Sequence, residues 1–330
     1  MLKSPEATIC ALASYLPKKI LSNFDLEQMV DTSNEWIVSR TGMQERRIAA
    51  NDEFASDMGY QAALRVCREA EIDPEEIDQI YLGSMTPDYP VPSTASLIQH
   101  RLGAKKAAAM DFQAACSGFL YGLNLAKAQV ESGLSECVLL VVSEKLSSVV
   151  DYEDRNTCVL FGDGAAAAII RKGGSGFRIG SVNLGSDGQQ AELLAIPAGG
   201  CRHPATELTV STGMHYLKMN GKELFKHALR RMEQALSTSL DSVKLGQEEI
   251  SWLVPHQANI RIIEGLAKRL NFPLEKVYTV IEKYGNTSAS SVPVALDDLI
   301  QKQEIAVGEK LALVAFGAGL TWGASVLEKV

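Results

Sequence analysis

The sequence has no apolar run approaching the ~18 residues that a membrane-spanning helix needs. It has no excess of basic residues either, because 32 Lys and Arg stand against 40 Asp and Glu and give a formal net charge of −8. This charge gives no reason to expect nucleic acid or an anionic membrane as a partner. The N-terminus lacks the basic start and apolar core of a signal peptide. We therefore expect a cytoplasmic protein.

Clustered metal ligands are missing as well. The six cysteines, at positions 10, 67, 116, 137, 158 and 201, form no Cys-x-x-Cys pair, and the five histidines are scattered. Tetrahedral zinc sites need such clusters, so we expect no metal. Most of the cysteines lie in apolar segments, as is typical of reduced thiols buried in a cytosolic protein.

Nucleotide-binding loops are also missing. The stretch Phe-Gly-Asp-Gly at 161–164 has neither the Gly-x-Gly-x-x-Gly spacing of dinucleotide sites nor the lysine of a phosphate loop. We interpret it as a tight structural turn, in which Asp163 hydrogen-bonds the backbone.

The chain repeats itself once, at an offset of 173 residues. Glu-Glu-Ile at 75–77 precedes an apolar strand pattern, and so does Glu-Glu-Ile at 248–250. The apolar run at 138–142 recurs at 311–315, and helical patterns that begin near 117 and 290 keep the same offset. Three matches in one register indicate a tandem duplication of a βαβ-rich unit with a mostly parallel, buried sheet. Further helical patterns cover 56–71 and 221–240.

The boundary between the halves falls in the glycine-rich stretch at 172–176. It divides the chain into an N-terminal half, residues 1–174, and a C-terminal half, residues 175–330. The alternative interpretation of this stretch is a plain hairpin turn.

One thiol differs from the other cysteines. Cys116 follows an apolar segment and two alanines, and a helical pattern begins at Phe119. This places the thiol at the first turn of a helix, where unpaired backbone N–H groups and the helix dipole favour an anion. A free cysteine titrates near ~8.5, and we expect this position to lower its pKa and supply thiolate at neutral pH.

Two further polar residues have similar contexts. His256 ends a predicted strand at a Pro-His corner, where α/β active sites collect polar groups. Asn286 lies in a Gly-Asn-Thr-Ser stretch. Taken alone, His256 could equally be a structural histidine, and Asn286 a turn or helix-capping residue. Together, a thiol, an imidazole and a carboxamide indicate acyl transfer.

A Cys/His/Asn set also fits a cysteine protease, and positions 116, 256 and 286 are spaced much as in papain-like enzymes. The context argues against this class. The residues before Cys116 lack the Cys-Gly-Ser-Cys-Trp run, and an internal duplication has no place in that fold.

At these residues the chain resembles the β-ketoacyl-[acyl-carrier-protein] synthase III family, the initiating condensing enzymes of type II fatty acid synthesis in the thiolase superfamily. The resemblance spans nearly the whole chain. It rests on Thr-Ser-Asn-Glu-Trp-Ile at 32–37 with Arg-Thr-Gly at 40–42, Ala-Cys-Ser-Gly at 115–118, Pro-His-Gln-Ala-Asn at 255–259, Tyr-Gly-Asn-Thr-Ser at 284–288 and Thr-Trp-Gly at 321–323. A Cys-His-Asn set, in place of Cys-His-His, separates this branch from elongating condensing enzymes.

The resemblance implies a duplicated thiolase-like five-layer α-β-α-β-α fold with mixed, mostly parallel sheets, and a homodimer that needs no cofactor. It implies that Cys116 takes an acyl group from acyl-coenzyme A, with acetyl as the expected primer. The oxyanion is then held by the backbone N–H groups of Cys116 and Ala318. Malonyl-acyl carrier protein loses carbon dioxide while His256 and Asn286 donate hydrogen bonds to the enolate oxygen, and the carbanion attacks the acyl-cysteine.

The resemblance also implies binding residues. Those for coenzyme A are Thr32, Trp36, Arg40, Arg155 and Asn259. Those for docking an acidic carrier protein are Lys226, Gln257, Arg261, Lys268 and Arg269, although a solvated helix face has the same sequence pattern.

Two positions depart from some members of the family. Val91 replaces a phenylalanine that shapes the acyl pocket across the dimer, so we expect a broader choice of primer. Ala318 replaces a glycine, which keeps the amide but would make a positive φ costly. The nearest alternative function is a related acyl-coenzyme A condensing enzyme or acyltransferase of secondary metabolism. A cysteine hydrolase and a catalytically silent carrier-binding homologue are the remaining alternatives.

Overall fold

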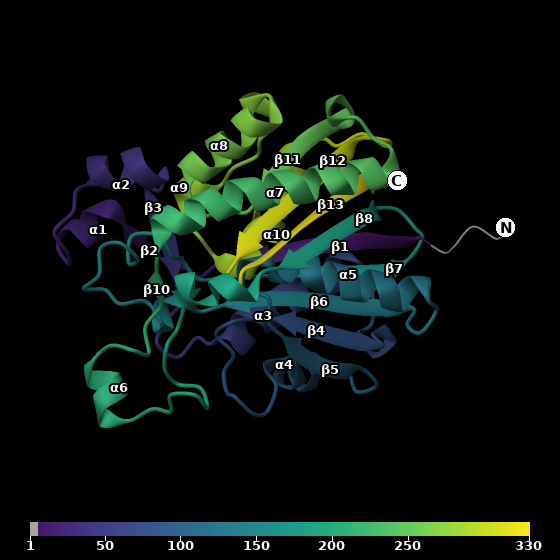
Figure 1. Cartoon of the computed structure of the whole chain (residues 1–330). Coiled ribbons are helices and arrows are strands. Elements are labelled where there is room, and N and C mark those ends of the chain that lie inside the picture. The colour runs from purple at the N-terminus through teal and green to yellow at the C-terminus, as the bar shows by residue number, and fades with distance from the viewer. Residues whose placement is uncertain (1–5) are drawn as a thin grey trace.

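The structure, a computed structural model, describes residues 6–330. Residues 1–5, on which the expected absence of a signal peptide partly rests, lie outside them. A nine-stranded mixed sheet runs through the molecule in the order β11-β12-β13-β8-β1-β7-β6-β4-β5 (Figure 1). Among the helices of residues 6–330, none has the length and apolar character needed to cross a bilayer.

The sheet consists of two groups of strands. The first comprises β1 (Ala7–Tyr15), β4 (Gln79–Gly83), β5 (Ala108–Phe112), β6 (Cys137–Glu144) and β7 (Gly164–Lys172). The second comprises β8 (Phe177–Ser186), β11 (Ile250–Pro255), β12 (Lys310–Gly317) and β13 (Thr321–Lys329). Among the strands of residues 6–330, the groups are joined by two residue pairs where β1 meets β8, Thr8 with Arg178 and Ile9 with Phe177.

The expected predominance of parallel pairing is wrong. β4 runs parallel to β5 and β6, and β11 runs parallel to β12, whereas the other neighbours in the sheet are antiparallel. The reason is visible at β12 and β13, which are separated by the short link 318–320. A connection this short can only produce an antiparallel pair.

Helices form three layers around these strands. α3 (Ala55–Glu69) and α4 (Thr94–Leu102) cover the outer side of the first group, and α7 (Gly221–Val243) and α8 (Ile260–Leu270) cover that of the second. α5 (Gly118–Glu131) and α10 (Ser291–Lys302) lie between the groups. The result is the expected α-β-α-β-α order. The helical patterns at 56–71 and 221–240 correspond to α3 and α7.

Shorter elements complete the chain. β2 (Lys19–Ser22), α1 (Asn23–Glu27), α2 (Asn34–Thr41) and β3 (Glu45–Ile48) lie together at one end, and α6 (Glu207–Ser211) projects on a long loop (Figure 1). The remaining elements are β9 (Leu194–Ala195), β10 (Lys218–Met219), α9 (Ile281–Tyr284) and the 3₁₀ turns η1 (Pro74–Glu76), η2 (Ala115–Ser117), η3 (Leu146–Ser148), η4 (Gly188–Leu193), η5 (Gln247–Glu249), η6 (Leu274–Lys276) and η7 (Ser288–Ser290).

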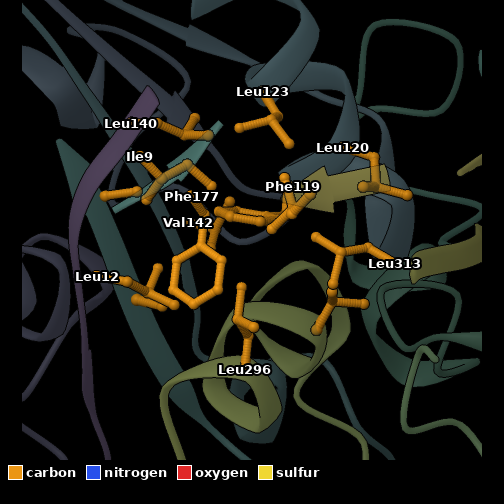
Figure 2. Packing of buried hydrophobic residues seen from close by; sticks show 14 of the residues in the cluster. Ile9, Leu12, Phe119, Leu120, Leu123, Leu140, Val142, Phe177, Leu296 and Leu313 are labelled. Atoms are coloured by element: carbon orange, nitrogen blue, oxygen red, sulfur yellow. The ribbon is translucent and has the colours of Figure 1, made fainter. Parts of the chain in front are cut away.

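The central helix layer is held by an apolar cluster. Phe119, Leu120 and Leu123 recur at helical spacing on α5 and are fully or almost fully buried. They pack with Leu296 of α10 and with side chains of both strand groups, as Figure 2 shows. A buried side chain of this size typically contributes several kcal/mol, since its truncation to alanine costs about 2–5 kcal/mol. This layer therefore fixes how the two halves sit against each other.

The repeat is visible in the structure at the same offset. η2 and η7 are 173 residues apart, and each leads directly into a central helix. Ala115 and Ser288, at equivalent positions in these turns, both have a positive φ, of 44° and 52°. The two turns lie against each other, which brings Cys116 close to the segment that carries Asn286.

The link 173–176 is not a hairpin, because β7 and β8 pair with opposite sides of β1 and not with each other. The division at residue 174 lies in this link and stays a prediction.

Candidate active site

A cavity of about 1070 Å³ opens beside α2, α7 and α8 and reaches inward to η2 and β12. Cys116, His256 and Asn286, which come from three distant parts of the sequence, all line it. Five of the other predicted site residues line it as well: Trp36, Arg40, Lys226, Asn259 and Arg261. The cavity thus joins the predicted reactive groups to five of the ten residues predicted to bind coenzyme A or to dock the carrier protein.

Cys116 lies where β12 passes very close to η2. A Cβ atom added to Gly317 would lie 2.6 Å from the Cys116 backbone nitrogen, so only glycine allows this approach. Gly317 lines the main cavity, whereas the next residue, Ala318, lines a smaller cavity of about 340 Å³. Ala318 has no positive φ, and the left-handed conformation falls on Gly319 at 131°. The strain expected from the alanine is therefore absent.

Cys116 is only 6% exposed. Burial raises the pKa of its thiol to about 12; the nearby Glu144 adds to the shift, and the Ser288 hydroxyl opposes it. The expectation of a thiolate at neutral pH is therefore wrong for the substrate-free protein, in which the cost of desolvation outweighs the favourable helix start. Sequence could not reveal this, because the burial comes from segments far away in the chain.

His256 is 4% exposed, and burial lowers the pKa of its imidazole to about 3. The ring is therefore uncharged at neutral pH. Its Nδ1 lies 2.6 Å from the Ser291 hydroxyl, whose oxygen also accepts a hydrogen bond from the Gln257 backbone N–H at 3.4 Å. Since that oxygen already accepts, its own proton is free to point to Nδ1. This arrangement favours the tautomer with the proton on Nε2.

Asn286 is held by its carboxamide oxygen, which accepts a hydrogen bond from the Ser288 backbone N–H at 2.9 Å. Its backbone pairs with Leu160 and Gly162 next to the Phe-Gly-Asp-Gly turn. Within residues 6–330 its amide nitrogen donates no hydrogen bond. A buried amide group with free N–H bonds is left for a ligand in the cavity. Asn286 and His256 thus supply two uncharged hydrogen-bond donors.

Comparisons with known proteins show the family of the chain. A family model described as 3-Oxoacyl-[acyl-carrier-protein (ACP)] synthase III matches residues 110–188, and the model of its C-terminal part matches residues 240–329. The chain is 54% identical to the β-ketoacyl-[acyl-carrier-protein] synthase III of Chlamydia caviae over 99% of this chain and 98% of that protein. The chain belongs to the β-ketoacyl-[acyl-carrier-protein] synthase III family.

Members of the synthase III family from more distant bacteria are also similar. The protein of that name from Caldanaerobacter subterraneus is 48% identical over 98% of this chain and 97% of its own length. The crystal structure of 3-oxoacyl-[acyl-carrier-protein] synthase III from Aquifex aeolicus matches with a TM-score of 0.90 at 45% identity, covering 98% of this chain and 99% of that one. The duplicated thiolase-like fold expected from the resemblance is confirmed, and the chain is an acyl-transferring condensing enzyme.

Of the five residues predicted to bind coenzyme A, Trp36, Arg40 and Asn259 line the cavity. The guanidinium groups of Arg40 and Arg155 lie 4.8 Å and 5.3 Å from the centre of the Trp36 ring. Arg155 also donates a hydrogen bond to the Asp31 backbone oxygen at 2.8 Å, and it does not line the cavity itself. Thr32 lies outside the cavity too, and its buried hydroxyl has no hydrogen-bond partner within residues 6–330.

Asn259, which is predicted to bind coenzyme A, also caps a helix. It is the N-cap of α8, and its carboxamide oxygen accepts a hydrogen bond from the Arg261 backbone N–H at 2.9 Å. Such a cap satisfies one of the unpaired N–H groups at the helix start. Asn259 also lines the cavity, and the cap uses only its carboxamide oxygen.

The predicted docking residues divide into two kinds. Lys268, Arg269 and Arg261 are exposed on α8, and Lys226 is exposed on α7. Gln257 is 0% exposed; its carboxamide donates to the Pro255 backbone oxygen at 2.6 Å and accepts from the Val280 N–H at 3.0 Å. The assignment of Gln257 to a docking surface is therefore wrong, because its side chain is buried and hydrogen-bonds the backbone at the end of β11 and at Val280.

Val91 does not lie in the cavity. Its side chain is 84% exposed. Its role in the acyl pocket stays a prediction.

Two buried residues at the site were missed by sequence reasoning. Ser291 holds His256, and Glu144 lies near Cys116 at the end of β6. Glu144 carried a usable signal, since a polar residue directly after a buried apolar strand is common at α/β active sites. The sequence contained no such signal for Ser291, because three of the four residues at 288–291 are serines and nothing distinguishes one of them.

The ring state of His256 can be checked without any substrate. We expect imidazole nitrogen-15 shifts of the intact protein to show an uncharged ring with the proton on Nε2 throughout pH 5–8, because the folded-state pKa lies far below this range. Ser291→Ala removes the hydroxyl that occupies Nδ1 and should produce a mixture of the two tautomers.

The matched control for Ser291→Ala is Ser290→Ala, whose hydroxyl instead donates to the Thr287 backbone oxygen at 2.8 Å. It should leave the tautomer unchanged. A titration midpoint of His256 between pH 5 and 8 in the wild type would contradict the assignment.

Proposed function

We propose that this member of the family condenses an acyl-coenzyme A primer, with acetyl as the expected acyl group, with malonyl-acyl carrier protein by decarboxylative Claisen condensation. The product is a β-ketoacyl-acyl carrier protein, so the enzyme initiates type II fatty acid synthesis. The observation that carries this proposal is that a buried thiol, Cys116, shares one cavity with two uncharged donors, His256 and Asn286. The names of relatives that are 45–54% identical support it.

In the first half-reaction, the Cys116 thiol loses its proton as its sulfur forms a bond to the thioester carbonyl carbon. The bond from that carbon to the coenzyme A sulfur breaks, and coenzyme A leaves as a thiolate that takes up a proton. The negative charge that develops on the carbonyl oxygen is held by the backbone N–H groups of Cys116 and Ala318. Donors fixed in advance in this way are typically worth ~3–4 kcal/mol each. Trp36, Arg40 and Asn259, which line the cavity, hold the coenzyme A together with Thr32 and Arg155, which lie outside it.

In the second half-reaction, malonyl-acyl carrier protein loses carbon dioxide. His256 and Asn286 donate hydrogen bonds to the thioester oxygen as enolate charge accumulates on it. The resulting carbanion attacks the acyl-cysteine, and Cys116 leaves as a thiolate. Both donors are uncharged, so neither binds the ground-state carboxylate as a counter-ion would. The proposed steps use only side chains and backbone groups, without a cofactor.

Docking and assembly belong to the same proposal. Lys226, Arg261, Lys268 and Arg269 form a basic rim for an acidic carrier protein on a chain of net charge −8. Lys226 and Arg269 are ion-paired with Glu223 and Glu233, which leaves Arg261 and Lys268 as the more available charges. We further infer a cytoplasmic homodimer in which Val91 reaches the partner's acyl pocket, since an apolar side chain this exposed fits a subunit contact.

Mass spectrometry of the Cys116 peptide tests the reaction directly. Treatment with acetyl-coenzyme A should add an acetyl group to this peptide, and malonyl-acyl carrier protein should remove it with release of carbon dioxide. Cys116→Ala should not load. His256→Ala and Asn286→Ala should load and then fail to discharge, because decarboxylation loses a donor. Loss of the acetyl group to water without malonyl carrier protein would point instead to a hydrolase.

The docking rim is tested by steady-state kinetics. Arg261→Ala should raise the KM for malonyl-acyl carrier protein on the order of tenfold at low salt, with a milder effect on acyl-coenzyme A. Arg68→Ala, an exposed arginine on α3 in the opposite outer layer, is the matched control and should change neither value. Equal effects of Arg261→Ala on both substrates would count against the rim.

The choice of primer follows from the small side chain at position 91. Initial rates with acetyl-, butyryl- and isobutyryl-coenzyme A should show measurable use of the longer and branched primers. Val91→Phe should narrow the choice to acetyl. A wild-type enzyme that uses acetyl alone would refute the role given to Val91.

A further inference from the structure

One hydroxyl group joins the turn that carries Ala318 to the turn that carries Cys116. Thr321 is the first residue of β13, and its hydroxyl oxygen lies 2.9 Å from the Ala114 backbone oxygen and 2.9 Å from the Ala318 backbone oxygen. Ala114 is the residue directly before η2. The single hydroxyl proton is shared between two carbonyl oxygens, as in other three-centre hydrogen bonds. Among residues 6–330, no other hydrogen bond connects the two turns.

The two turns approach each other at backbone N–H groups that are not used in the fold. The Cys116 nitrogen lies on the side of Gly317, where an added Cβ would come within 2.6 Å of it. The next nitrogen along the chain from Gly317 is that of Ala318. Among residues 6–330, neither of these two N–H groups donates a hydrogen bond to a backbone oxygen. Unpaired backbone donors next to a reactive thiol are the arrangement that an oxyanion requires.

The far end of the link between β12 and β13 is held separately. The Leu320 N–H donates to the Asp187 backbone oxygen at 2.9 Å, and the Asp187 N–H donates to the Leu320 oxygen at 2.8 Å. The Asp187 carboxylate pairs with Arg231 at 3.1 Å. Ala318 has no comparable support, since among residues 6–330 its backbone has no hydrogen bond except the one from Thr321. The orientation of Ala318 therefore depends on that hydroxyl group.

We propose that Thr321 is a positioning residue, whose hydroxyl group sets the Ala318 N–H relative to the Cys116 N–H so that both donate to one oxyanion. This inference rests on the proposed function, which gives the oxyanion to these two N–H groups. Thr321 lines the smaller cavity of about 340 Å³ and not the main one, so it acts through the backbone of Ala318. Such donors stabilise charge only when they are held in place before the reaction begins.

This role affects some steps of the reaction and not others. A tetrahedral oxyanion forms when Cys116 attacks the acyl-coenzyme A, and again when the carbanion attacks the acyl-cysteine. Decarboxylation instead places charge on the enolate oxygen, to which His256 and Asn286 donate. Loss of the Thr321 hydroxyl should therefore slow acyl loading and spare decarboxylation. A general role in stability predicts that both steps are lost together.

Thr321→Ser and Thr321→Ala form the test pair, because both lack the same methyl group and differ only in the hydroxyl. Acetyl loading on Cys116 is followed by mass spectrometry in single turnovers, and carbon dioxide release from malonyl-acyl carrier protein is measured without primer. Thr321→Ala should load on the order of tenfold more slowly than Thr321→Ser, less than the loss of a whole oxyanion donor costs, because the N–H is displaced and not removed. The two variants should release carbon dioxide at the same rate.

Equal loading rates in the two variants would overturn the proposal, and so would an equal loss of loading and carbon dioxide release in Thr321→Ala. Thr321→Val, which has nearly the size of threonine, allows the same comparison should Thr321→Ala not fold. The matched control is Thr238→Ala on α7, whose hydroxyl also donates to a backbone oxygen at 2.9 Å, that of Gln234, at an exposed site. It should change neither rate.

Infrared spectroscopy of the acetylated enzyme reads the oxyanion donors directly. Hydrogen bonds weaken a carbonyl bond and lower its stretching frequency, so the carbon-13 acetyl band on Cys116 should lie at a higher frequency in Thr321→Ala than in Thr321→Ser. Acetylation with p-nitrophenyl acetate needs neither coenzyme A nor carrier protein, and Cys116→Ala supplies the background.

The same spectra separate this inference from the proposed function. The expected band difference in a protein whose wild type releases no carbon dioxide from malonyl-acyl carrier protein would support the role of Thr321 and refute the condensing activity. Identical bands in Thr321→Ala and Thr321→Ser of an enzyme that condenses would refute the role of Thr321 and leave the condensing activity.

Discussion

The meeting of two buried helix starts is the constraint on which the rest of the site depends. α5 and α10 lie between the strand groups and begin at η2 and η7, which touch each other. Within residues 6–330, neither helix has a side-chain hydrogen bond that caps its start. The dipoles of both helices make this interior point favourable for negative charge. Every step proposed for the reaction generates a negative charge at this place.

Burial determines which form each reactive group takes. The same desolvation that keeps Cys116 protonated keeps His256 uncharged and pushes Glu144 toward its protonated form. A site in which every resting group is close to neutral costs less to bury than one containing a preformed ion pair. The charge needed for chemistry then appears only with the substrate, where backbone donors and the two uncharged side chains stabilise it.

The sequence was sufficient to predict those features of the fold and the site that depend on local patterns and on the internal repeat. The offset of 173 residues predicted two related halves with helices that begin near 117 and 290, and the strand pattern before His256 predicted that this residue lies at a strand end. What sequence could not supply depends on distant neighbours. The raised pKa of Cys116, the burial of Gln257 and the hydroxyl behind His256 follow from segments packed from elsewhere in the chain. The antiparallel majority followed from connections whose paths only the fold reveals.

The short pairing between β1 and β8 limits which substitutions this enzyme can accept in its interior. Two residue pairs hold the strand groups together, so the separation between sulfur and imidazole is set chiefly by the side chains interleaved around α5 and α10. A methyl group lost from that interior would displace reacting atoms as well as weaken the molecule. The same buried leucines, valines and phenylalanines therefore affect both the thermal stability and the turnover rate of the enzyme. A substitution among them is expected to change both.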